Sequence, residues 1–154
     1  MNKEILIDFC KAVRISTLKR IQSVPQGFEN WHISKNSLSF AEIIKHLIEI
    51  DEWTIRKINE PAIKSILPEK GSIENCTREQ FDALILELDK GLERKINFIG
   101  SLDNKKLQTK IYDDRFIDEV SVEWIILRGN LDHEIHHRGQ IAAYLRVLMD
   151  KSKI

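Results

Sequence analysis

The sequence has few of the features that would assign it to several large classes of protein. Its two cysteines, Cys10 and Cys76, lie far apart and form no C-x-x-C motif, so we expect no disulfide framework. No apolar run approaches the roughly 18 residues of a membrane span. Glu4 and Asp8 interrupt the N-terminal stretch where a signal peptide needs an unbroken apolar segment. We therefore expect a cytoplasmic protein without a membrane partner.

Net charge is also absent, since 24 Lys and Arg residues balance 24 Asp and Glu residues. Non-specific binding to nucleic acid is driven by clustered positive charge, and the chain has no dense Lys or Arg run, so we expect no nucleic-acid partner. A chain of 154 residues can bury one core without disulfides or a structural metal. We expect a single domain over residues 1–154.

Glycine and proline are scarce, with six and three residues, which leaves long segments free to be helical. Apolar residues recur at helical spacing in four segments, at about 3–24, 39–60, 77–100 and 121–149. Together with almost no strand signal, they predict an all-α four-helix bundle with long loops. Residues 107–114 alternate weakly in polarity and are a candidate short strand.

Local signals fix the starts of the two middle helices. Ser39 with Glu42, and Thr77 with Gln80, have the spacing of capping boxes. For the first helix we expect a core-facing stripe made of Ile5, Phe9, Val13, Leu18 and Ile21.

Three of the five histidines fall within the stretch NLDHEIHHRGQIAAYLRVL of the last predicted helix. His133 and His137 are four residues apart, so they share one helix face, and that face is mostly apolar. Two inward-facing imidazoles need partners, because a buried unpaired polar group costs about 1–3 kcal/mol. A shared metal ion would satisfy both, and hydrogen bonds to neighbouring side chains are the alternative.

His133, Glu134 and His137 also spell H-E-x-x-H, the motif of zinc metalloproteases. Those enzymes find a third ligand downstream, whereas no His, Glu or Cys follows His137 here. The upstream candidates are His46, at the inner edge of an apolar helical stripe, and His32, in a polar loop where a histidine is usually solvated. We favour a metal site of His46, His133 and His137. Three imidazoles leave open coordination positions, which mark a catalytic rather than a structural site.

Glu134 and His136 adjoin this pair of histidines. Glu134 is a candidate catalytic general base. The alternatives are a solvated helix carboxylate or a residue that orients a ligand. Glu134 points about 100° away from His133, as any adjacent helical residue does. We expect His136 at the edge of the site or on the surface.

Three separated features resemble the DinB/YfiT family. They are the run HEIHHRGQIAAYLR in the last helix, the run IIKHLIEIDEW with its single histidine, and Trp31 before the capped second helix. The resemblance covers essentially the whole chain and makes the H-E-x-x-H match coincidental to proteolysis. It implies a four-helix bundle, often a homodimer, that holds a divalent metal through three histidines. These correspond to His46, His133 and His137.

The activities that the resemblance implies are mixed. Some family members look like metal-dependent hydrolases, others are thiol S-transferases that use bacillithiol or mycothiol, and many have no assigned reaction. We expect a metal-dependent enzyme acting on a small molecule, with one zinc or nickel ion and a low-molecular-weight thiol such as bacillithiol. The alternative is a non-catalytic module that senses or sequesters metal in a stress response. We also expect a homodimer that buries apolar helix faces.

Overall fold

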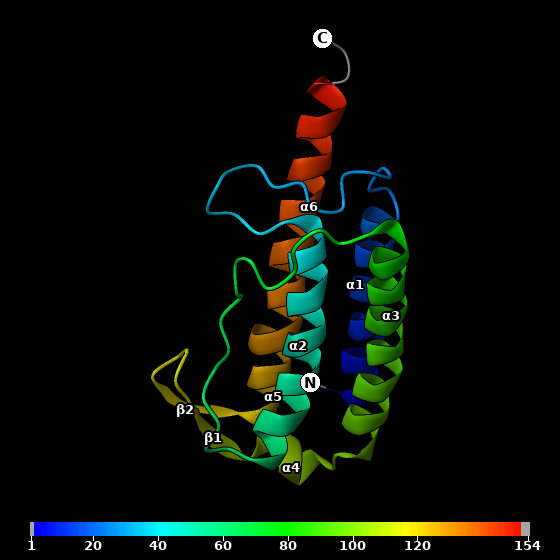
Figure 1. Cartoon of the computed structure of the whole chain (residues 1–154). Helices are drawn as coiled ribbons and strands as arrows, with labels where there is room; N and C mark the ends of the chain where they lie inside the picture. Colours follow the sequence, from blue (N-terminus) through cyan, green and yellow to red (C-terminus); the bar gives the residue numbers. More distant parts are fainter. Residues whose placement is uncertain (1, 152–154) are drawn as a thin grey trace.

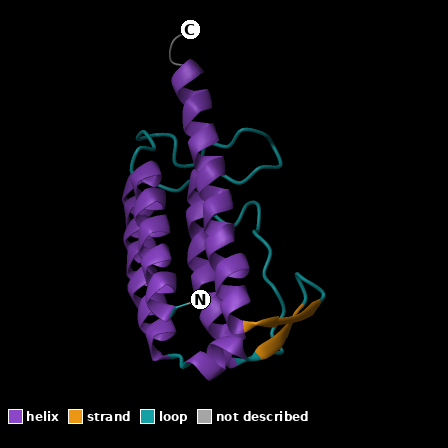
Figure 2. Cartoon of the chain, turned by 180° about the vertical axis from the view of Figure 1, so that it is seen from behind, coloured by secondary structure: helices purple, strands orange, loops and turns teal. Residues whose placement is uncertain are grey.

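The computed structural model describes residues 2–151 and confirms the four-helix bundle. Its long helices are α1 (Lys3–Ile21), α2 (Phe40–Asn59), α3 (Arg78–Ser101) and a continuous last helix made of three successive parts. These parts are α5 (Val122–Trp124), η1 (Ile125–Leu131) and α6 (Asp132–Lys151). The helices run side by side, and the C-terminal end of α6 extends beyond the others (Figures 1 and 2).

The backbones of neighbouring helices do not approach one another equally closely around the bundle. Helix α2 packs on α3, α3 on α1, and α1 on α6. In contrast, α2 meets the last helix mainly along η1 and only sparsely along α6. Side chains of both helices, such as Leu47 and Ile141, fill the space between α2 and α6 and belong to one buried cluster.

Both predicted capping boxes are present. The Ser39 hydroxyl accepts from the Glu42 amide at 3.2 Å, and the Glu42 carboxylate accepts from the Ser39 amide at 2.7 Å. Thr77 and Gln80 make the same reciprocal pair. These bonds satisfy amides that have no partner within the helix, and α2 and α3 begin directly after them.

The predicted inner face of α1 is partly wrong. Val13 and Ile21 are buried, but Ile5 and Phe9 are 48% and 53% exposed. The buried face is instead formed by Leu6, Cys10, Val13, Arg14, Thr17 and Ile21. Apolarity does not mark this face, because Arg14 on it has its partners on other helices and Thr17 donates to the Val13 carbonyl within α1.

The connection between α3 and the last helix folds into the short helix α4 (Asn104–Gln108) and an antiparallel hairpin. The strands are β1 (Lys110–Asp113) and β2 (Asp118–Ser121), so the short strand expected within residues 107–114 is present. The long segment 60–76 passes along the flank of α2 (Figure 1). Its Ser65 amide and hydroxyl both donate to the Asp114 carboxylate, at 3.0 and 2.7 Å, which joins this segment to the hairpin.

The core consists of two apolar clusters with a buried polar layer between them. One cluster includes Phe40, Leu47, Phe81 and Ile141, and the other includes Leu6, Ile58, Ile99 and Ile125. Within residues 2–151, no helix combines the length and apolarity that a membrane span requires.

Candidate metal centre

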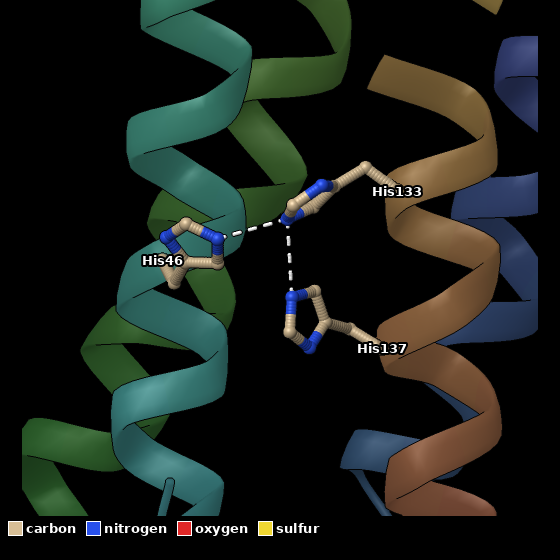
Figure 3. A group of neighbouring side chains, drawn as sticks. All are labelled: His46, His133 and His137. Atoms are coloured by element: carbon tan, nitrogen blue, oxygen red, sulfur yellow. Dashed lines mark hydrogen bonds between the residues drawn. The ribbon is translucent and has the colours of Figure 1, made fainter. Parts of the chain in front are cut away.

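The three predicted ligands come together between α2 and α6 (Figure 3). The Nε2 atom of His133 lies 2.8 Å from Nε2 of His46 and 3.1 Å from Nε2 of His137. One ring nitrogen from each residue lies within 4.8 Å of the other two. No further His, Cys, Asp or Glu of the described residues joins this group as a possible ligand. Three nitrogens from two helices therefore face one common point.

Helical spacing explains this convergence. His133 and His137 project from successive turns of α6, and His46 projects from the apolar face of α2 between Ile43 and Ile50. His46 and His137 are buried, and His133 is half-buried. The imidazoles thus lie between α2 and α6.

A chain of hydrogen bonds fixes the tautomer of His137. The Tyr144 hydroxyl donates to the Leu38 carbonyl at 3.1 Å, so it accepts from the Gln140 amide nitrogen at 2.9 Å. The Gln140 carbonyl oxygen consequently faces His137 and accepts from Nδ1–H at 2.9 Å. The proton of neutral His137 is therefore on Nδ1, and the lone pair on Nε2 points towards the other two histidines.

His46 has no equivalent support. Its Nδ1 is buried without a hydrogen-bond partner, and the Glu49 carboxylate lies 4.0 Å away. Histidines that bind metals usually donate their second N–H to a carboxylate, a carbonyl or water. Glu49 is thus the nearest carboxylate that could accept from Nδ1 after a small side-chain movement.

The surroundings hold all three imidazoles neutral at pH 7. Burial, together with a smaller effect of the neighbouring histidines, lowers the pKa of His46 to about 4 and the pKa of His133 to about 3. Burial also lowers the pKa of His137, although the hydrogen bond to Gln140 opposes this shift. Neutral imidazole is the form that binds a metal ion.

These residues fit a divalent ion. Nitrogen lone pairs that point at one another at 2.8 and 3.1 Å repel unless a proton or a cation lies among them. Neutral imidazole is a ligand that suits zinc, nickel, copper and iron. Gln140, itself held by Tyr144, accepts from the second ring N–H of His137, as is usual for a histidine that binds a metal.

The other predicted residues lie outside the triad. His32 contacts the Ser34 carbonyl through Nδ1, at 2.6 Å, in the loop before α2. His136 is exposed, and its ring centroid lies 5.2 Å from that of His137, which places it at the edge of the site as expected. Neither residue belongs to the group of possible ligands.

Glu134 points into the bundle core and is not solvated. Its carboxylate accepts from Nε and Nη2 of Arg14, at 2.9 and 3.0 Å, and lies 3.6 Å from the Lys95 ammonium. The general-base role of Glu134 stays a prediction, and this pairing favours a structural role because both carboxylate oxygens already have cationic partners.

Sequence reasoning missed Arg115, which lies close to the triad. Its guanidinium stacks over the Trp53 ring at 4.0 Å, donates to the Gly129 carbonyl at 3.2 Å, and contributes to the lowered pKa of His133. A β-carbon at Gly129 would lie 2.3 Å from Arg115 Nη2. A glycine inside a helix was the one available signal, because glycine is disfavoured there.

Comparison with known proteins supports the same fold. A crystal structure of a DinB-like protein from Bacillus subtilis, YjoA, matches with a TM-score of 0.68 and 18% identity, over 93% of this chain and 90% of that chain. The crystal structure of an uncharacterized protein from Clostridium difficile 630 matches with a TM-score of 0.64 and 14% identity, over 96% of this chain and 97% of that chain. At these identities the likeness shows the fold alone.

No curated protein shows significant similarity to the sequence. The model of the DinB family, in contrast, matches residues 1–151, which is nearly the full length. With its four-helix bundle and its three converging histidines, the chain belongs to the DinB family.

Proposed function

We propose that this protein is a metal-dependent enzyme that acts on a small molecule, by thiol S-transfer or by hydrolysis. The observation that carries the proposal is the convergence of Nε2 of His46, His133 and His137 from two helices. A divalent ion held by three neutral imidazoles keeps its full charge and supplies a Lewis acid that lowers the pKa of a thiol or of water.

The open ligand set favours an enzyme over a sensing or storage module. A structural zinc site is closed by four protein ligands, whereas catalytic sites keep a position free. Among the described residues, only the three imidazoles share this point. A fourth carboxylate or thiolate would have favoured the non-catalytic alternative.

Two segments outside the bundle, the hairpin and residues 60–76, are candidates for substrate contacts. The Trp53 indole donates to the Lys64 carbonyl at 2.8 Å, which holds segment 60–76 against α2. Arg115, in the turn of the hairpin, stacks on the Trp53 ring and so holds the hairpin against α2. The charge of Arg115 is balanced by the buried Asp113 carboxylate, which lies 2.7 Å from its Nη2 atom. The hairpin and segment 60–76 are therefore both fixed on Trp53, seven residues after His46 on α2, and we propose that their side chains select the substrate.

We favour thiol transfer over hydrolysis on electrostatic grounds. Without a carboxylate among the ligands, the site favours an anion, and a thiolate is a softer anion than hydroxide and suits zinc or nickel. In such a transfer the thiol proton leaves to solvent, sulfur bonds to an electrophilic carbon, and the leaving group departs with its bonding electron pair. Bacillithiol is the thiol that we would test first.

The test is a paired activity screen of the metal-loaded protein. Zinc-loaded and nickel-loaded protein would be assayed for bacillithiol-dependent loss of an alkyl halide and for hydrolysis of ester and amide substrates. We expect thiol transfer that is lost in His133→Ala and kept in His136→Ala. A protein that binds metal but shows neither activity would contradict the enzyme and support the non-catalytic module.

A further inference from the structure

Two cationic and two anionic side chains form a buried layer next to the histidine triad. They are Arg14 of α1, Asp51 of α2, Lys95 of α3 and Glu134 of α6, so each long helix contributes one. Their side chains are 0%, 6%, 1% and 2% exposed. Two cations and two anions give the layer no net charge.

Two of these residues bridge the helices that carry the histidines. Arg14 donates to Asp51 at 2.7 Å and to Glu134 at 2.9 and 3.0 Å, so it joins α2 to α6. Lys95 donates to Asp51 at 2.7 Å and to the Asn130 side chain of η1 at 2.8 Å. Asn130 in turn donates to Asp51 at 2.9 Å. Both bridges therefore meet at Asp51.

The bridged positions flank the histidines in sequence. Glu134 follows His133 directly, Asn130 precedes it by less than one turn, and Asp51 lies just over one turn after His46. The polar layer and the triad thus lie next to each other, at the same level along the bundle. The polar layer therefore joins the two ligand-bearing helices at the level of the histidines, in addition to the apolar packing between them.

Two members of this layer, Asp51 and Arg14, are held in their ionised forms. Burial alone would raise the pKa of Asp51, but Lys95 and Arg14 outweigh it and hold that pKa below its ordinary value. Burial would lower the pKa of Arg14, and Asp51 and Glu134 outweigh that effect. The contact between Arg14 and Asp51 is therefore an ion pair at neutral pH.

Stability alone is a poor explanation for such a layer. Replacing a whole buried ion pair by apolar residues of similar volume is often neutral or stabilising, because the charges lose their hydration. The layer does supply directional contacts of fixed length, which apolar packing would not. We infer that Arg14, Asp51, Lys95 and Glu134 are positioning residues that set the spacing of His46 from His133 and His137, an inference that rests on the proposed metal site.

The test separates positioning from stability by removing one complete pair. In Arg14→Met combined with Glu134→Met, Asp51 and Lys95 still neutralise each other, so the metal-free melting temperature should stay near that of the wild type. We expect the zinc dissociation constant, measured by competition with a chromophoric chelator, to rise about tenfold, as for other groups that orient metal ligands. Leu6→Ala, two turns along α1 from Arg14, is the matched control. It should melt lower and keep the wild-type zinc affinity.

Each outcome decides between the possibilities. If the double variant binds zinc as tightly as the wild type, the layer has only a structural role and the inference is wrong. If the double variant does not fold, Glu134→Gln, which removes one charge at constant shape, should weaken zinc binding more than Leu6→Ala does, and equal affinities would overturn the inference. A wild-type protein that binds neither zinc nor nickel would instead overturn the proposed metal site itself.

Discussion

Removing the single hydroxyl of Tyr144 should weaken both the fold and the metal site. Tyr144 is 3% exposed, and its hydroxyl accepts from Gln140 at 2.9 Å and donates to the Leu38 carbonyl at 3.1 Å. Tyr144→Phe leaves the carbonyl of buried Leu38 without this donor and the half-buried Gln140 amide without its acceptor, which costs roughly 1–3 kcal/mol. For a chain of this size, 2 kcal/mol corresponds to a melting temperature lower by roughly 4–8 °C.

The effect on the metal follows from the loss of orientation. Without the hydroxyl, the Gln140 amide can rotate, and its oxygen no longer has to face Nδ1 of His137. The lone pair on His137 Nε2 is then no longer fixed towards the triad, and we expect zinc affinity to fall by about tenfold. Chelator competition measures the affinity, and thermal unfolding of metal-free protein measures the stability.

The chain offers a matched control in its other tyrosine. Tyr112 lies on β1 and is 52% exposed, so Tyr112→Phe removes the same atom from a site exposed to solvent. We expect neither the melting temperature nor the zinc affinity of this variant to change. If Tyr144→Phe also binds zinc as tightly as the wild type, the hydrogen-bond chain does not orient His137 and this reasoning fails.

The remaining predictions concern pH, substitutions at two glycines, and assembly. The pKa of His46 is about 4, below its ordinary value of 6.5, so the unfolded chain takes up protons first. The unfolding free energy of the metal-free protein should be level above about pH 7 and fall between about pH 6.5 and 4 in urea titrations, and less so in His46→Gln. Gly129→Ala should destabilise because its β-carbon meets the pinned Arg115, whereas Gly139→Ala, with open space around it, should stabilise by up to about 1 kcal/mol in the same titrations. The homodimer stays a prediction, and light scattering that reports a monomer at micromolar concentrations would contradict it.

Local patterns account for what the sequence could predict. The capping boxes, the four helices and the His133 and His137 pair all depend on residues within one or two turns of each other. His46 could be added because it lies at the edge of the apolar stripe of α2. The resemblance to the DinB family agreed with this choice.

The remainder depends on contacts that no local pattern encodes. Arg14 has partners 37 and 120 residues away, so its burial could not be read from α1 alone. Because the face of α1 that carries Arg14 lies against these partners, Ile5 and Phe9 lie outside the core. The π-helical hydrogen bonding of η1, where the Asp132 amide donates to the Leu127 carbonyl, also has no sequence signal that periodicity could detect.

The most direct test of the central claim is the metal content of purified histidine variants. We predict one divalent ion per wild-type chain and loss of most of it in His46→Ala, His133→Ala and His137→Ala. His32→Ala and His136→Ala should keep it, because these residues lie outside the triad. Elemental analysis after dialysis measures the metal-to-protein ratio directly. A His46→Ala protein that keeps full occupancy would contradict the three-histidine site.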